Sequence, residues 1–219
     1  MTVVAPTLTL ERKLLAEFDL IISLDEVGRG ALAGPVAVGA SVMDAAGSRR
    51  RVPEGLRDSK LVTEKRRPEV AARAADWVQA SGVGWASAAE VDEGGIMRAL
   101  GLAASRAIDA VVALGARLDG ALVILDGNHD YVSRVHPIPL QVRSVIKGDR
   151  DCASVSAASV IAKVARDAHM ADLHCEHPAY QWDRNKGYAS LEHRAAIRDA
   201  GLSPFHRASW AIADAPTLF

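Results

Sequence analysis

The sequence predicts an α/β domain whose mixed β-sheet is flanked by helices, with a small helical and loop-rich appendage at the C-terminal end. Three observations support this prediction: short apolar runs of strand length, longer segments with helical apolar spacing between them, and a polar, turn-rich composition after about residue 178. We expect an N-terminal extension over residues 1–18, the main domain over 19–177 and the appendage over 178–219. The chain of 219 residues is 49% hydrophobic, which is enough for one sizeable core.

The expected elements alternate along the chain. Two apolar runs flank a glycine-rich turn near the start, so we expect them to pair as an antiparallel hairpin. The segment that follows the third strand repeats apolar residues at helical spacing, at Ile96, Leu100, Ala103, Ala107 and Val111. The expected helices cover residues 90–114 and 154–173. The expected strands cover 20–24, 36–43, 82–88, 121–125 and 141–146, and the last two read as buried.

Charge and composition exclude several classes of protein. The net charge is −1, so the chain lacks the overall basic character of many nucleic-acid binders, and its local clusters of arginine and lysine are each typical of a solvated face. No run approaches the roughly 18 apolar residues of a membrane span, and residues 1–10 do not resemble a signal peptide. We therefore expect a cytoplasmic protein without a membrane partner. Its two cysteines, Cys152 and Cys175, are expected to be reduced.

Acidic residues follow the apolar runs at three places. The run 20–24 leads into Asp25 and Glu26, the run 121–125 into Asp126, and the run 142–146 is followed by Lys147, Gly148 and Asp149. A single acid after a strand is most often a turn residue or a helix cap, but three such places and an adjacent pair weaken that explanation. Converging carboxylates without histidine or thiolate form a hard oxygen site, which suits magnesium or manganese.

Two other patterns in the sequence could suggest a binding site. Residues 28–33 satisfy the G-x-G-x-x-G/A pattern of dinucleotide-binding proteins, but two acids precede them and a strand-like run follows where that pattern needs a helix. The group His169, His174, Cys175 and His177 matches no familiar zinc spacing, and a polar helix end explains it better. Neither pattern therefore predicts a cofactor.

The chain resembles type 2 ribonuclease H, the ribonuclease HII family of bacteria. The resemblance extends over about residues 19 to 210, and its motifs occur in family order at family-like spacing. They are Asp25-Glu26-Val27-Gly28-Arg29-Gly30, Ala33-Gly34-Pro35-Val36, Asp58-Ser59-Lys60, Glu64-Lys65-Arg66, Asp126-Gly127-Asn128, Lys147-Gly148-Asp149, Ser156-Ala157-Ala158-Ser159, Ala162-Lys163-Val164 and Lys186-Gly187-Tyr188.

The resemblance implies a ribonuclease H-like fold and an endonuclease that cuts the RNA strand of RNA–DNA hybrids. It also implies cleavage on the 5′ side of single ribonucleotides in duplex DNA, which would begin ribonucleotide removal. Two ions, Mg²⁺ or Mn²⁺, would be held by Asp25, Glu26, Asp126 and Asp149 and would drive hydrolysis to a 3′-hydroxyl and a 5′-phosphate. Asp151 is a rival for the fourth position, although the spacing to Ser156 favours Asp149.

The resemblance also implies a set of substrate contacts. The main chain of Gly28, Arg29 and Gly30 would read the ribose 2′-hydroxyl, and the ring of Tyr188 would stack beside the junction sugar. The remaining expected contacts to the nucleic acid are Ser59, Lys60, Asn128, Lys147, Lys163, Arg184 and Lys186. Leu61 stands where many members have a second lysine, which removes one expected phosphate contact.

The sequence argues against two rival classes of protein. Another nuclease or recombinase of this fold would lack the Gly-Arg-Gly and Lys-Gly-Tyr elements, and a catalytically silent binding module would be expected to have lost acids. We expect a monomer. The tail Asp214–Phe219 resembles short Leu-Phe peptides that dock on bacterial sliding clamps, although a frayed or self-packed terminus is the commoner explanation of such a tail.

Overall fold

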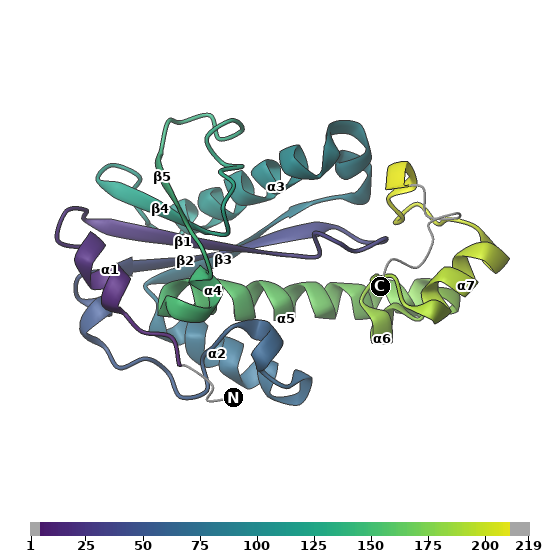
Figure 1. Ribbon diagram of the computed structural model, residues 1–219, viewed down its shortest axis with the longest axis horizontal. Helices are drawn as coiled ribbons and strands as arrows, with labels where there is room; N and C mark the ends of the chain where they lie inside the picture. The colour runs from purple at the N-terminus through teal and green to yellow at the C-terminus, as the bar shows by residue number, and fades with distance from the viewer. Residues whose placement is uncertain (1–4, 211–219) are drawn as a thin grey trace.

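A computed structural model describes residues 5–210 of the chain. One five-stranded sheet, in the order β3-β2-β1-β4-β5, lies at its centre (Figure 1). The strands are β1 (Leu20–Val27), β2 (Val36–Asp44), β3 (Ala80–Ala86), β4 (Ala121–Asp126) and β5 (Gln141–Val145). The helices are α1 (Thr9–Leu14), α2 (Arg67–Trp77), α3 (Ala88–Ala113), α4 (Gly148–Asp151), α5 (Ala153–Glu176), α6 (Trp182–Asn185) and α7 (Leu191–Ala200).

The sheet has mixed strand directions, as the sequence predicts. Strands β1 and β2 form the expected antiparallel hairpin, and β3 continues it on the far side of β2. Strand β4 instead runs parallel to β1, with Leu24 opposite Leu125, and β5 runs parallel to β4. The central strand β1 therefore has an antiparallel neighbour on one side and a parallel neighbour on the other, and the α/β prediction is confirmed.

Two long helices cover the two faces of the sheet (Figure 1). Helix α3 packs on one face against the side chains of β1 residues such as Ile22 and Leu24, and α5 packs on the other face with α2 outside it. Close approach of α5 to β2 depends on Gly39, because a Cβ atom there would collide with the main-chain oxygen of Ala158. The glycine in β2, together with the small residues Ala158 and Ala162 of α5, thus allows the helix to lie directly on the strands.

The prediction that β5 is buried is wrong. Its side chains are exposed or half-buried, since β5 is an edge strand whose one neighbour among the strands of residues 5–210 is β4. Helices α1 and α2 were not expected from the sequence. In α2 the buried residues Val70, Ala71, Ala74 and Trp77 do have helical spacing, but alanine and charged residues dilute that pattern. Among residues 5–210, no helix is both long enough and apolar enough to cross a membrane.

The C-terminal segment packs against the end of α5. Its helices α6 and α7 and the 3₁₀ turn Pro178–Tyr180 enclose a small apolar cluster of their own. Besides residues of the segment itself, this cluster contains Met170 and Leu173 of α5 and the pair Leu32 and Ala33 from the loop between β1 and β2. The segment is thereby joined to the loop that follows β1.

Glu11 links α1 to the start of α5. Its carboxylate is fully buried and accepts hydrogen bonds from the main-chain N–H and the hydroxyl of Ser154, at 2.9 and 2.8 Å. Ser154 in turn accepts a hydrogen bond from Ser23 of β1 at 2.7 Å. Burial raises the pKa of Glu11, and the hydrogen bonds from Ser154 oppose that rise. Glu11 therefore serves as a cap for α5 supplied from another helix.

We predict that Glu11→Ala lowers the free energy of unfolding by about 2–3 kcal/mol, because it leaves the buried N–H of Ser154 without an acceptor and opens a cavity. Glu17→Ala removes an exposed glutamate from the neighbouring turn and serves as the matched control. Urea unfolding monitored by circular dichroism measures both variants. Equal losses of stability in the two would contradict the capping role of Glu11.

Candidate active site

The ends of β1 and β4 bring two predicted acids together. Leu24 pairs with Leu125, so the next residues along the two parallel strands, Asp25 and Asp126, occupy neighbouring positions. Side chains alternate along a strand, which places Asp25 on the α5 face, where Ser159 donates a hydrogen bond to its carboxylate. Glu26 lies on the opposite side of the strand end, 3.4 Å from the hydroxyl of Tyr131.

Asp149 joins this group from the turn after β5. Lys147 adopts a left-handed conformation with φ 60°, which ends the strand and turns the chain into α4. The main-chain N–H of Asp149 then donates a hydrogen bond to Asp126 Oδ1 at 3.2 Å, and the hydroxyl of Ser156 donates to the carbonyl of Asp149 at 2.7 Å. Asp151 instead forms an exposed ion pair with Arg150 at 2.7 Å.

The acids repel one another electrostatically. Burial raises the pKa of Asp25 well above its ordinary value, and the charges of Glu26, Asp126 and Asp149 raise it further. Burial, together with the charges of Asp126 and Asp58, also raises the pKa of Asp149 to about 6, although Lys60 opposes this rise from 3.7 Å away. Burial is the largest cause of both shifts, and the negative charge of the neighbouring acids adds to it.

The donor set fits a hard divalent cation. All four predicted ligands are carboxylates, and a positive ion would offset the repulsion that raises the pKa of Asp25 and Asp149. Within residues 5–210, no three histidine, cysteine, aspartate or glutamate side chains are already arranged to hold a metal ion. The same holds for the histidines near the end of α5. His174 lies 3.4 Å from Asp183, but within residues 5–210 no third side chain of this kind completes the group.

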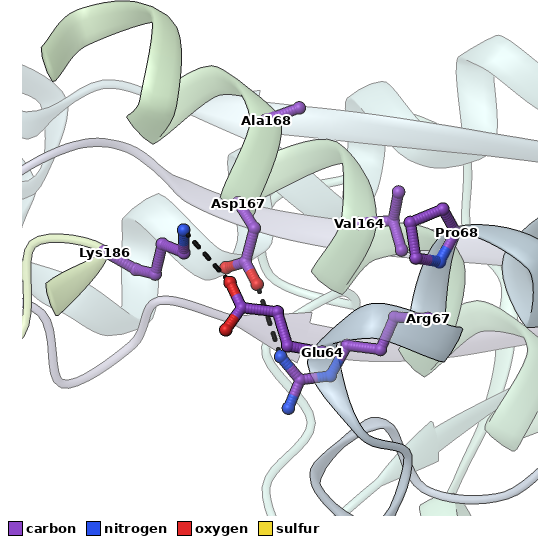
Figure 2. Close-up of a pocket in the computed structure, with 7 residues that line it drawn as sticks. All are labelled: Glu64, Arg67, Pro68, Val164, Asp167, Ala168 and Lys186. Carbon is purple, nitrogen blue, oxygen red and sulfur yellow. Dashed lines mark ion pairs between the residues drawn. The ribbon is translucent and has the colours of Figure 1, made fainter. Parts of the chain in front are cut away.

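A cavity of about 490 Å³ opens beside Asp25 and Glu26. It collects predicted substrate contacts from four separate parts of the chain, namely Gly28, Arg29, Gly30, Ser59, Lys60, Lys163 and Tyr188. Lys186 lies next to it, in a second cavity of about 230 Å³ that Glu64, Arg67 and Asp167 also line (Figure 2). The fold thus gathers most of the expected contacts around the acids.

Three expected contacts lie outside these two cavities. Asn128, Lys147 and Arg184 are exposed and line neither of them. Asn128 follows Asp126 after one residue, and Lys147 precedes Asp149 by two, so both lie near the acids along the chain. Arg184 approaches Gln181 at 3.5 Å on the surface of α6.

A model of the family described as "Ribonuclease HII" matches residues 22–213. The chain belongs to the ribonuclease HII family. A ribonuclease HII of Streptomyces avermitilis is 49% identical over 96% of this chain and 85% of its own length. This membership confirms the enzyme class that the motifs predict, a hydrolytic ribonuclease.

Solved structures have the same fold. The ribonuclease H2 of Pyrococcus horikoshii matches 89% of this chain and 95% of its own with a TM-score of 0.68 and 26% identity. A ribonuclease HII of Archaeoglobus fulgidus, solved in complex with PCNA, matches 87% of this chain and 95% of its own with a TM-score of 0.68 and 21% identity. A Bst ribonuclease HIII in complex with Mn²⁺ matches 91% of this chain and 70% of its own with a TM-score of 0.70 and 19% identity. The ribonuclease H-like fold is therefore confirmed.

Two buried arginines hold the glycine loop of this ribonuclease HII, and sequence reasoning missed both roles. Arg166 of α5 donates hydrogen bonds to the carbonyl groups of Ala33, Pro35 and Lys186. Arg207 donates to the carbonyl groups of Gly28, Arg29 and Gly34 at 2.7, 2.8 and 3.2 Å. Gly28 has a φ of +82°, and a Cβ atom there would collide with the Arg166 side chain, so only glycine fits.

His193 and His206 fix the main chain at Tyr188. Its carbonyl contacts His193 Nδ1 at 2.8 Å, and His193 Nε2 accepts a hydrogen bond from the indole N–H of Trp182 at 3.0 Å. Because Trp182 can only donate, His193 must carry its proton on Nδ1 and donate to Tyr188. His206 completes the arrangement, since its Nδ1 accepts from the N–H of Ser203 and its Nε2 lies 3.1 Å from His193.

We predict that Asp25→Asn stabilises this ribonuclease HII in the presence of chelator at pH 8. The folded pKa of Asp25 is raised, so stability falls as the pH rises from its ordinary value of 3.8 through the folded value. Asparagine is neutral at every pH, and Tm should rise by about 2–4 °C for each kcal/mol of relieved repulsion.

Calorimetry at pH 4 and pH 8 measures this difference, which should shrink toward pH 4 because wild-type Asp25 is then protonated in the folded protein and partly protonated in the unfolded chain. Asp119→Asn, at an exposed position, is the control and should show no such pH dependence. A difference in Tm that grows toward low pH would contradict the assigned repulsion.

Proposed function

We propose that this ribonuclease HII hydrolyses the RNA strand of RNA–DNA hybrids and cuts on the 5′ side of single ribonucleotides embedded in duplex DNA. One observation carries the proposal: the acids at the ends of β1 and β4 lie beside a cavity that contains Gly28, Arg29, Gly30 and Tyr188. Such a cavity combines a metal-binding edge with main-chain donors and an aromatic ring, which are the groups that recognise a ribose.

We further propose that Asp25, Glu26, Asp126 and Asp149 hold two divalent ions, Mg²⁺ or Mn²⁺. When bound, such ions activate a water molecule and stabilise the departing 3′-oxygen, which leaves a 3′-hydroxyl and a 5′-phosphate. The carboxylates provide the negative charge that attracts the ions, and Lys60 lies 3.7 Å from Asp149, where it can also contact a substrate phosphate. The Mn²⁺ complex of the Bst ribonuclease HIII supports this choice of metal.

The orientation of the glycine loop supports its role in reading the 2′-hydroxyl. Arg207 binds the carbonyl groups of Gly28 and Arg29. In a trans peptide the N–H of the next residue points away from the carbonyl, so the N–H groups of Arg29 and Gly30 point away from Arg207. Both residues line the cavity, which makes these N–H groups suitable donors to a ribose hydroxyl.

We also propose that two segments of the chain supply different parts of the site. Residues 19–177 would supply the metal ligands, and residues 178–219 would supply Tyr188 and Lys186 as substrate contacts. The tail Asp214–Phe219 lies outside the described residues, and its docking on a sliding clamp stays a prediction. The complex of the Archaeoglobus fulgidus enzyme with PCNA supports testing that prediction.

We predict that Asp126→Asn and Asp149→Asn fold but lose at least about 10²–10³-fold in kcat, because each removes a charged metal ligand. Asp151→Asn is the matched control, since Asp151 is two residues from Asp149 and pairs with Arg150 instead. Cleavage of a duplex with one ribonucleotide is measured with magnesium, with manganese and with chelator. Loss of activity in Asp151→Asn but not in Asp149→Asn would mean that the fourth ligand is misassigned.

Tyr188→Ala should lower cleavage at a single ribonucleotide by roughly one to two orders of magnitude, since stacking on one nucleotide is worth about 1–3 kcal/mol. A long uniform hybrid should be affected less, because it offers many registers and further 2′-hydroxyl contacts. The measurement is the ratio of kcat/KM for the two substrates, in wild type and variant, at fixed salt and magnesium concentrations. A ratio that does not change would make Tyr188 a packing residue only.

A further inference from the structure

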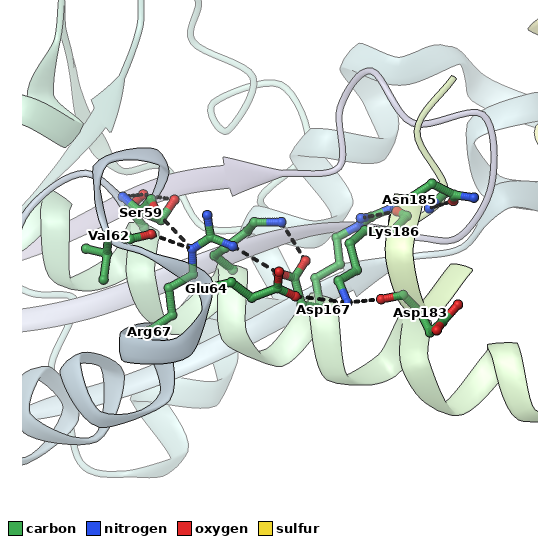
Figure 3. A network of polar contacts seen from close by, with 12 residues as sticks. Ser59, Val62, Glu64, Arg67, Asp167, Asp183, Asn185 and Lys186 are labelled. Atoms are coloured by element: carbon green, nitrogen blue, oxygen red, sulfur yellow. Dashed lines mark hydrogen bonds and ion pairs between the residues drawn. The ribbon is translucent and has the colours of Figure 1, made fainter. Parts of the chain in front are cut away.

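Asp167 of α5 binds two cations that come from different parts of the chain. Lys163, one turn earlier on the same helix, donates to Asp167 Oδ1 at 2.5 Å. Arg67 at the start of α2 lies 3.5 Å from Asp167 Oδ2 (Figures 2 and 3). The side chains of Lys163 and Asp167 are both only 13% exposed. Such a partly buried arrangement is held far more firmly than an exposed ion pair.

Lys163 is the part of this cluster that faces the substrate. It lines the cavity beside Asp25 and lies 6.0 Å from the centre of the Tyr188 ring. Burial lowers the pKa of Lys163, and the charges of Arg67 and Arg166 lower it further, whereas the hydrogen bond to Asp167 raises it. An ammonium group has three donors, so the bond to Asp167 leaves two for a ligand in the cavity.

Arg67 connects the same carboxylate to a second group of substrate contacts. Its Nε donates to the carbonyl groups of Ser59 and Val62, at 3.0 Å in each case (Figure 3). The turn Ser59–Leu61 also contacts α5 directly, because the main-chain N–H of Ser59 donates to the hydroxyl of Ser159 at 3.4 Å and the two hydroxyl groups lie 3.1 Å apart. Arg67 and Ser159 therefore both hold the turn that contains Lys60, and Arg67 links this turn to Asp167.

We propose that Asp167 is a positioning residue for substrate binding, which fixes Lys163 and the Ser59–Lys60 turn relative to each other so that both contact phosphates of one nucleic acid strand. This inference rests on the proposed function. The other carboxylate of the neighbouring cavity cannot take this role. Glu64 is 71% exposed and pairs with Lys186 at 3.3 Å, so solvent and salt weaken that bond.

The sign of the effect separates positioning from simple electrostatics. Removing a negative charge next to a phosphate-binding surface should by itself tighten binding, because it adds one net positive charge. If Asp167 positions the two contacts, Asp167→Asn should instead weaken binding, since Lys163 and Arg67 lose their common anchor. Asparagine has nearly the same shape as aspartate, so the substitution changes the charge and little else.

The experiment compares Asp167→Asn, Asp167→Glu and Lys163→Gln, with the double variant of Asp167→Asn and Lys163→Gln. KM and kcat are measured on an RNA–DNA hybrid at several salt concentrations, and Kd for the uncleaved hybrid is measured with chelator. We expect Asp167→Asn to raise KM and Kd about tenfold with kcat within about twofold, and to reduce the salt slope by about one phosphate contact. Asp167→Glu should restore part of the affinity.

The matched control is Glu69→Gln, which removes an exposed carboxylate that pairs with Arg73 on the same helix as Arg67. It should leave KM unchanged or slightly lower. A double variant no worse than Lys163→Gln alone would place both residues in one unit. The inference is overturned if Asp167→Asn binds the hybrid as tightly as wild type or more tightly, or if the two single effects simply add.

Two further outcomes keep the test decisive. If Asp167→Asn melts far below wild type, Asp167→Glu and Arg67→Lys replace it, because both retain the charge of the original residue. Their Kd for the hybrid is then compared with that of wild type. A Kd that is unchanged in both variants overturns the inference. If wild type binds the hybrid but does not cleave it with either metal, the proposed function fails. The Kd series then still decides the role of Asp167.

Discussion

Two buried guanidinium groups, which form no ion pair with a carboxylate of residues 5–210, hold the substrate side of this ribonuclease HII together. Arg166 and Arg207 are fully buried, and main-chain carbonyl groups accept their hydrogen bonds. Burial and the charge of Arg166 lower the pKa of Arg207 to about 10, which reflects the cost of this arrangement. A cation desolvated in this way is tolerated only if every carbonyl stays in place. The loop after β1, the end of α5 and the Tyr188 segment are therefore fixed as one unit.

This arrangement also explains why the site can bind an anionic substrate although the chain is almost neutral. Asp25 and Glu26 line the cavity, whereas Arg166 and Arg207 donate to carbonyl groups of the glycine loop, so negative charge gathers where metal ions are expected and positive charge lies behind that loop. Separated charges produce a local field that the net charge of −1 does not reveal. The distribution of charge, and not its sum, makes the surface suitable for a nucleic acid.

Sequence reasoning predicted those parts of the candidate site whose position depends on local pattern. An apolar run that ends in Asp25 and another that ends in Asp126 are visible in the sequence, because strand ends and acids occur together there. Arg207 could not be recognised in the same way, since its partner Gly28 lies 179 residues away and contributes only a carbonyl group. Every residue has such a carbonyl, so no side-chain signal marks the contact. The exposure of β5 was missed because an edge strand and a buried strand can have similar apolar content.

The strand order has a consequence for synthesis on the ribosome. The meander of β3, β2 and β1 can pair as soon as residue 86 has emerged, but the other edge of β1 has no partner until β4 is made, 40 residues later. At about 5–20 residues per second, that edge of β1 stays unpaired for several seconds in the nascent chain. Unpaired strand edges are templates for association with other chains. The central strand that supplies Asp25 is thus also the segment that a chaperone would have most reason to shield.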